Sequence, residues 1–229
     1  GNATYTKIKN PIYNGDIDIV RAHKDSQVMV GGIVGYALYD TLYNAKVSMV
    51  DAENIKINGN HKIKVSNIMG ASLDSGVASN IAVGGIVGYN AAGTVVGEIG
   101  AVQENTVNNI DIEIIIGSNI ANNVNNVKAV SVGGIVGYSA SSSSLLNRAI
   151  NTGNISIEDY SNYYVKTEDY ISVGGLVGRA DGAVGLNYIY NAGNISSKFV
   201  KTAEKLYIGG LVGSANQGVN VTYFANYGD

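Results

Sequence analysis

Short segments in which isoleucine alternates with polar residues recur along the chain, and turn-forming glycine and asparagine separate them. The clearest examples are NGDIDI from Asn14, NNIDIEI from Asn108 and TGNISI from Thr152. Alternation with a period of two is typical of β-strands with one buried face, and Val, Ile, Tyr and Thr are residues that strands favour. The pattern therefore predicts an all-β chain of short strands.

A glycine-rich hexapeptide occurs five times. It reads GGIVGY at Gly31, Gly84 and Gly133, GGLVGR at Gly174 and GGLVGS at Gly209. Paired glycines before a two-residue apolar step predict a sharp corner, where a positive φ or the close approach of stacked backbones excludes a Cβ. We therefore assign a structural role to the pairs Gly31 and Gly32, Gly84 and Gly85, Gly133 and Gly134, Gly174 and Gly175, and Gly209 and Gly210.

Before each hexapeptide, a segment places an isoleucine after a turn-forming residue. These marker isoleucines are Ile17, Ile55, Ile110, Ile155 and Ile195. One such repeat is too small to bury its own apolar residues. Stacking solves this problem, because parallel strands of successive coils pair and their side chains form interior ladders. We expect the marker isoleucines to form one ladder and the apolar pair of each hexapeptide to form another.

The fold class that follows is an all-β parallel β-helix, or β-solenoid, of about five glycine-rich repeats. A right-handed coil is the expected hand, although no residue of the sequence fixes it. A β-propeller would require four strands per unit at fairly even spacing, whereas the spacing between hexapeptides shortens steadily from Gly31 to Gly209. An antiparallel sandwich would not need the same hexapeptide in every unit.

Asparagine recurs at corresponding turns, as at Asn14, Asn151 and Asn191. Its side chain tolerates left-handed backbone and bonds to the backbone two residues on, which makes it common in turns of any kind. Stacked asparagines of successive repeats would also bond to one another along the axis. Both interpretations stay open at the level of sequence.

The whole chain, residues 1–229, is predicted to be a single repeat domain and a fragment of a longer array. Its two ends are in the same phase, since PIYNGDIDI from Pro11 aligns with IYNAGNISS from Ile189. Spacing varies mainly between a marker isoleucine and the next hexapeptide, which predicts variable inserts at 58–82 and 158–172. Neither end shows a polar capping unit, so end-to-end self-association is expected.

Composition removes several classes of chemistry. The 229 residues carry a formal net charge of -3 and include no cysteine, which argues against a nucleic-acid partner and excludes thiolate and zinc–thiolate sites. His23 and His61 stand in no metal-ligand spacing. Asp16 and Asp18 share a strand face, but it is the solvated face if the neighbouring isoleucines point to the core. We therefore expect no catalytic residue, no cofactor, no metal and no membrane insertion.

The insert at 158–172 is the strongest candidate for binding. It contains the tyrosines Tyr160, Tyr163, Tyr164 and Tyr170 beside several acidic residues. Tyrosine combines a large apolar area with a polar tip at low entropic cost, which suits contacts with protein or glycan. The alternative is that these tyrosines lengthen one coil and pack locally.

The hexapeptides resemble the GLUG motif, a short glycine-rich repeat of large bacterial surface and secreted proteins. GGIVGY, GGLVGR and GGLVGS, with YNGDI, NTGNI and NAGNI between them, cover nearly the whole chain. The resemblance implies a place among adhesin-like proteins and the repeat-bearing N-terminal regions of immunoglobulin A metalloproteases, at the cell surface or outside the cell. It implies no catalytic residues. The chain departs from the motif's pattern around 52–56 and in the insert before Val83.

The expected function is a non-catalytic structural or adhesive module that displays loops for a host protein or glycan. One alternative is a substrate-positioning repeat region of a secreted immunoglobulin A-type metalloprotease. A second is a carbohydrate-active β-helix enzyme, because polysaccharide lyases and hydrolases use this fold. Fold analogy alone carries little weight, and the few arginines form no repeated cluster with aspartate.

Overall fold

A computed structural model describes part of the chain, and every structural statement below refers to that part. The described residues are 1–4, 7–9, 11–20, 27–38, 41–43, 46–47, 61–68, 80–93, 95–96, 105–116, 129–140, 144–159, 170–199 and 205–229. Within them the chain forms β-strands joined by turns and contains no helix. The predicted binding residues Tyr160, Tyr163 and Tyr164 lie outside the described residues, as do Ile55 and His23.

Four sheets, which we call A to D, contain these strands. Sheet A has the order β1 (Asn2–Thr4), β6 (Val34–Leu38), β11 (Val87–Ala92), β16 (Val136–Ser139), β21 (Val177–Ala180) and β25 (Val212–Ala215). Sheet C has the order β4 (Ile17–Val20), β9 (Lys62–Ile68), β14 (Asp111–Ile116), β19 (Ile155–Asp159) and β23 (Ile195–Phe199). Sheet D has the order β5 (Val28–Gly31), β10 (Asn80–Gly84), β15 (Ala129–Gly133), β20 (Tyr170–Gly174) and β24 (Lys205–Gly209).

Sheet B is made of two columns of short strands that meet in one long strand. The first column is β2 (Lys7–Lys9), β7 (Thr41–Tyr43), β12 (Val95–Val96) and β17 (Ser144–Asn147). The second is β3 (Ile12–Tyr13), β8 (Lys46–Val47), β13 (Thr106–Asn108) and β18 (Ala149–Asn151). Both columns pair with β22 (Val184–Asn191), which in turn pairs with β26 (Val219–Asn226).

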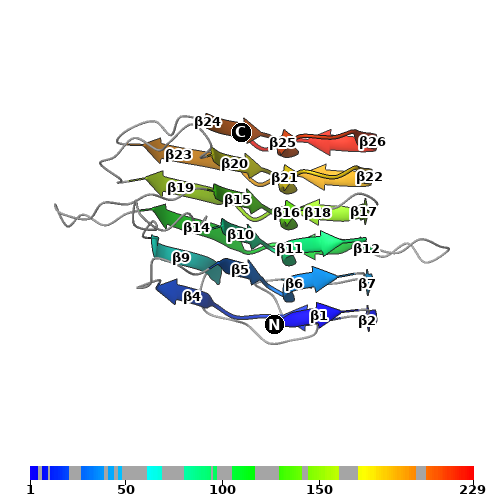
Figure 1. Ribbon diagram of the computed structural model, residues 1–229, viewed down its shortest axis with the longest axis horizontal. Helices are drawn as coiled ribbons and strands as arrows, with labels where there is room; N and C mark the ends of the chain where they lie inside the picture. The colour runs from blue at the N-terminus through cyan, green and yellow to red at the C-terminus, as the bar shows by residue number, and fades with distance from the viewer. Residues whose placement is uncertain are drawn as a thin grey trace.

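Neighbouring strands of a sheet come from successive repeats and run parallel. In sheet D, for example, Gly84 pairs with Gly133, and Gly133 pairs with Gly174. Figure 1 shows the outcome: β4, β9, β14, β19 and β23 lie one above another in tiers between the N-terminal and C-terminal ends. The prediction of an all-β chain with parallel sheets is confirmed.

Ladders of isoleucine and valine form the interior. In sheet C the register aligns Ile17, Ile63, Ile112, Ile155 and Ile195. Ile63, Ile112 and Ile155 are almost completely buried, and burial of such a side chain contributes about 1.5–3 kcal/mol. The apolar pairs of the hexapeptides form a second ladder, as predicted, with Val87 paired to Val34 and to Val136.

The marker assignment is wrong in two repeats. Ile110 is buried at the bend before β14, whereas the member of the ladder is Ile112. In the second repeat the member is Ile63 rather than Ile55, and the strand that holds it, β9, lies inside the predicted insert 58–82. ENIKI, the segment from Glu53 that contains Ile55, and KIKV, the segment from Lys62 that contains Ile63, both alternate with a period of two. The alternation alone therefore did not distinguish them.

Candidate functional site

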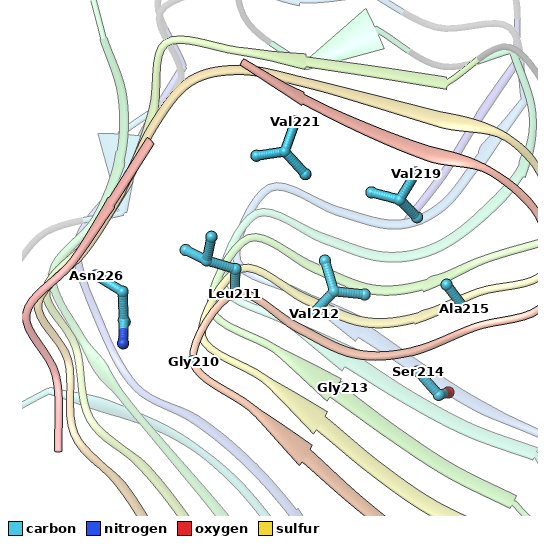
Figure 2. A pocket seen from close by; sticks show the side chains of 9 residues that line it. All are labelled: Gly210, Leu211, Val212, Gly213, Ser214, Ala215, Val219, Val221 and Asn226. Carbon is cyan, nitrogen blue, oxygen red and sulfur yellow. The ribbon is translucent and has the colours of Figure 1, made fainter. Parts of the chain in front are cut away.

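Each hexapeptide turns the chain sharply from sheet D into sheet A. Figure 2 shows this turn at Gly210, where the chain doubles back and Leu211 and Val212 point into the interior. The fifth residue of each hexapeptide is also a glycine, and it faces away from the interior, toward the backbone of sheet D. A Cβ on Gly137 would lie 2.5 Å from the backbone nitrogen of Val83 in sheet D. Because real Cβ atoms do not come closer than 3.0 Å to such atoms, only glycine lets the outer faces of sheets A and D pack so closely.

A column of asparagines, buried at Asn108, Asn151 and Asn191 and exposed at Asn226, lies against the second glycine of the hexapeptides. Asn108, Asn151, Asn191 and Asn226 occupy the same position in successive repeats of sheet B. Nδ2 of Asn108 donates to Oδ1 of Asn151 at 2.7 Å, and Asn151 donates in the same way to Asn191 at 2.9 Å. Asn191 donates to Asn226 at 2.8 Å. We call this column the asparagine ladder, and it confirms the prediction that stacked amides bond along the axis.

One predicted member of the ladder is wrong. Tyr13 pairs with Val47, and Val47 pairs with Asn108, so Tyr13 and not Asn14 stands at the ladder position of the first repeat. That turn reads YNGD where the later ones read NTGN and NAGN. Asn14 therefore lies one position after the ladder position, as the strand register shows.

A row of tyrosines follows the outer face of sheet A. Tyr36, Tyr89 and Tyr138 are the sixth residues of the first three hexapeptides and pair in register. The ring centroids of Tyr36 and Tyr89 are 5.6 Å apart and stacked, and those of Tyr89 and Tyr138 are 5.1 Å apart and meet edge to face. Arg179 takes the same position in the fourth hexapeptide. In the fourth repeat, the cationic side chain of Arg179 therefore replaces the aromatic ring of the row.

Arg179 belongs to a tightly bonded polar network centred on Asp181. The carboxylate of Asp181 accepts hydrogen bonds from Nε of Arg179 at 2.5 Å and from its Nη2 at 3.0 Å. It also accepts from the hydroxyl of Tyr138 at 2.6 Å and from Nδ2 of Asn216 at 2.8 Å. The guanidinium carbon lies 3.8 Å from the ring centroid of Tyr170, within the range of a cation–π interaction. These contacts fix the guanidinium in one orientation.

Both phenols of this network stay protonated at neutral pH. Burial raises the pKa of Tyr138, and the hydrogen bond and negative charge of Asp181 raise it further. Burial also raises the pKa of Tyr170, and the charge of Arg179 only partly offsets this effect. The two hydroxyls therefore act as hydrogen-bonding groups and not as bases.

A polar cavity of about 420 Å³ opens beside the network. Its wall combines cationic, aromatic and amide groups from sheets A and D and from the turn after β25. The lining residues are Tyr170, Arg179, Lys205, Tyr207, Ser214, Ala215 and Asn216. Such a mixture of flat rings and hydrogen-bond donors can hold a polar ligand in one orientation. We take this polar cavity as the candidate site.

Only part of this site was identified from the sequence. Of the predicted binding residues, Tyr170 is described, and it begins β20 and lines the polar cavity. Arg179 and Asp181 were missed. The available signal was the change at the sixth position of the hexapeptide, which is tyrosine three times and then arginine, with an aspartate two residues later.

In three successive repeats of sheet B, one residue with a large side chain adopts a left-handed backbone conformation. Arg148, Tyr188 and Tyr223 follow the aligned residues of β17, β22 and β26 and have φ values of 55°, 51° and 51°. Positive φ costs a bulky residue free energy, so neighbouring contacts must compensate. The guanidinium of Arg148 lies 4.9 Å from the ring centroid of Tyr188, which stacks on Tyr223 at 4.6 Å. We call this stack the corner stack.

Charged residues on sheet C form a second cluster. Glu113 makes ion pairs with Lys62 and with Lys64, the latter at 3.0 Å. Oδ1 of Asp16 accepts a hydrogen bond from the backbone nitrogen of Lys62 at 2.8 Å and lies 3.4 Å from Nδ1 of His61. The ion pairs of Glu113 join β14 to β9, and the hydrogen bond to Asp16 joins β9 to β4, so the cluster ties three successive repeats together.

The structure also shows where the aspartates considered as candidate catalytic residues lie. Asp16 and Asp18 are exposed, while Ile17 and Ile19 pack against the core, as the alternation predicted. In the described ranges no three His, Cys, Asp or Glu side chains are close enough together to hold a metal ion. The same ranges contain no helix long and apolar enough to cross a membrane.

Comparisons with known proteins give no relative. No family model matches the chain, and neither a curated protein nor a solved structure matches it. The resemblance of the hexapeptides to the GLUG motif therefore rests on the residues of this chain alone.

Proposed function

We propose that the chain forms a parallel β-helix, or β-solenoid, as one repeat domain. The proposal is supported by the recurring sheet order, because the described strands follow one another along the chain in the order D, A, B and C. A right-handed coil is expected, because connections between parallel strands of one sheet are right-handed in almost all proteins.

Engineered disulfides test the stacking directly, since the native chain has no cysteine. Ser156 and Ser196 pair in register on adjacent strands of sheet C, so their Cα atoms lie within the range that a disulfide bridges. The double variant Ser156→Cys, Ser196→Cys should crosslink quantitatively on mild oxidation. The control pair Ser156→Cys, Ser197→Cys points to opposite faces and should not. Equal crosslinking of both pairs would refute the stacked register.

In this proposal the β-helix is a non-catalytic adhesive or structural module of a bacterial surface or secreted protein, and its polar cavity binds a glycan. The observation that carries it is the fixed guanidinium of Arg179 beside the ring of Tyr170, with Tyr207, Lys205 and Asn216 at the same wall. Flat rings suit the apolar faces of sugars, while these donors suit their oxygen atoms.

The same geometry argues against catalysis at this wall. The carboxylate of Asp181 already accepts four hydrogen bonds, and the phenols of Tyr138 and Tyr170 remain protonated. None of these groups is available as a general base, which a hydrolase or lyase would need within reach of its substrate.

A glycan array probed with the purified chain tests the ligand class, followed by calorimetric titration of the best binder. Lys205→Ala and Tyr207→Ala should each weaken binding at least tenfold, because both side chains line the cavity without belonging to the Asp181 network. Lys198→Ala, an exposed lysine on β23, is the matched control and should bind normally. Binding of a protein partner alone, unchanged by both cavity variants, would overturn the proposal, and so would turnover of the glycan.

A further inference from the structure

The outer face of sheet B is apolar where the outer face of sheet C is charged. In sheet C, Lys64 and Glu113 pair in register at outward positions. In sheet B, Val107, Ile150 and Tyr190 pair in register and alternate with buried residues, so their side chains point away from the core. Scattered apolar residues are normal on a surface, but an apolar column over three repeats is typical of an interaction surface.

A groove of about 580 Å³ opens beside this column. Its lining includes Tyr188 and Tyr223 of the corner stack, Ile150 and Tyr190 of the column, and Asn105. Apart from Tyr223, these residues lie in repeats that have a described repeat on either side, so the groove belongs to the side of the stack. Figure 1 shows this side at the right, where β17, β22 and β26 lie in successive tiers. We call this feature the corner groove.

The corner stack adopts a backbone conformation that its residues do not favour. Arg148, Tyr188 and Tyr223 all have a positive φ, which asparagine adopts more readily than other residues with a side chain. Counted from the paired strands, the sequence has asparagine at the matching position of the first two repeats, Asn10 and Asn44. Backbone conformation alone would therefore favour asparagine throughout. Large side chains at such a strained position are typical of binding sites.

One unpaired cation stands beside the corner groove. The guanidinium of Arg148 stacks on Tyr188, which is 45% exposed, and it has no ion-pair partner among the residues that the structure describes. The described lining of the groove contains no acidic side chain. An unpaired guanidinium next to aromatic rings and an apolar column selects a ligand that carries a negative charge close to an apolar group.

We propose that the corner groove binds an extended segment of a partner protein in which an acidic residue stands close to an aromatic or aliphatic residue. The carboxylate pairs with Arg148, and the apolar side chain covers Ile150 between the rings of Tyr188 and Tyr190. Tyrosine and arginine are enriched among the residues that dominate protein–protein binding. A sugar fits less well, because Asn105 and the tyrosine hydroxyls are the only hydrogen-bonding side-chain groups in the described lining.

Two sets of short synthetic peptides test the proposal by fluorescence anisotropy with the purified chain. In the acidic set, Asp or Glu stands a few positions from Phe, Leu or Ile, and in the basic set Lys replaces the acid. The native chain should bind members of the acidic set about tenfold more tightly than their lysine counterparts. Arg148→Asn should remove this preference. Tyr188→Asn should weaken binding of the acidic set about tenfold.

Both variants introduce the residue that the first two repeats have at this position, so the backbone accommodates them and the far-ultraviolet spectrum should stay unchanged. Lys198→Gln is the control, because it removes an exposed lysine from β23 of sheet C, away from the groove. It should bind like the native chain.

Several results would overturn the proposal. A native chain that binds both peptide sets equally, or neither set, is one, and an asparagine variant that binds like the native chain is another. Loss of the preference in Lys198→Gln also contradicts it. Glycan binding that Tyr188→Asn abolishes would assign the groove to sugars instead. The polar cavity lies on sheets A and D and is tested through Lys205 and Tyr207, so failure here leaves the proposed glycan binding there untouched.

Discussion

A Cβ on Gly134 would lie 2.6 Å from the amide nitrogen of Asn151. The relationship repeats along the chain, since a Cβ on Gly175 would lie 2.6 Å from the amide nitrogen of Asn191. The second glycine of the hexapeptide and the asparagine of the N-x-G turn, which are separate motifs in the sequence, are therefore two sides of one contact. Positive φ is not the reason for this glycine: among the described glycines only Gly93 has one.

Replacement of Gly134 by alanine should destabilise the fold strongly. The new methyl group would overlap both the side-chain amide of Asn151 and the backbone carbonyl oxygen of Gly175. The first is held by the hydrogen bonds of the asparagine ladder and the second is backbone, so there is little room for relaxation. We expect a loss of about 3 kcal/mol in the free energy of unfolding, at the upper end for overpacking. Urea denaturation measures it. Gly218→Ala is the matched control, because no atom lies within 4 Å of a Cβ there, and an equal loss in both variants would contradict the contact.

The asparagine ladder predicts a difference between its middle and its end. Asn151→Ala removes a bond from Asn108 and a bond to Asn191 and leaves a buried acceptor on Asn191 without its donor. Asn108→Ala also leaves one acceptor unpaired, on Asn151, but it removes the Oδ1 of Asn108, which has no partner among the described residues. An unpaired buried group costs about 1–3 kcal/mol.

Asn151→Ala should therefore lower the free energy of unfolding by about 1–3 kcal/mol more than Asn108→Ala. Both side chains are completely buried, so loss of packing is similar in the two variants and cancels in the comparison. Thermal and urea unfolding in parallel provide the measurement. Equal costs would mean that the amides stack without cooperating.

Glu113 should make the stability of the protein depend on acid pH. Partial burial alone would raise the pKa of this carboxyl, but hydrogen bonds and positive charge from Lys62 and Lys64 outweigh it and lower the pKa. A lowered pKa in the folded state contributes stability above the unfolded value of about 4.3, and this contribution is lost as the pH falls through the folded value.

The native chain should consequently be more stable than Glu113→Gln at pH 7, and the difference should shrink below the unfolded pKa of about 4.3 and be lost once the pH has fallen through the lower folded-state pKa of Glu113. Urea unfolding of both proteins at several pH values measures it. Lys64→Met removes a partner instead of the acid and should reduce the same acid-dependent difference. A gap between native and Glu113→Gln that persists unchanged at low pH would show that the ion pairs are not its cause.

Asp181 should hold the phenol of Tyr138 in its protonated form. Burial is the largest cause of the raised pKa of Tyr138, followed by the hydrogen bond and charge of Asp181. Asp181→Asn keeps an acceptor but removes the charge, so the pKa of Tyr138 should fall and remain above its ordinary value. Ultraviolet titration of each protein against its Tyr138→Phe version isolates this phenol, and an unchanged midpoint would mean that burial alone sets it.

The sequence by itself determined the kind of structure and its repeating unit. Alternation such as IDIV in β4 and ISIED in β19 predicted strands with one buried face, because the side chains of a strand point to opposite sides in turn. The hexapeptide predicted a corner that admits no Cβ at positions such as Gly84 and Gly133. Both inferences depend on local geometry, which a few consecutive residues are enough to specify.

Tertiary structure decided the register and the site. Ile63 and not Ile55 stands beside Ile112, because pairing between distant segments chooses among strands that alternate equally well. Arg179 contacts Tyr170 only because the glycine at the fifth position of each hexapeptide lets sheets A and D pack back to back. These contacts join residues of different strands, and their distances depend on how the repeats stack rather than on any single segment.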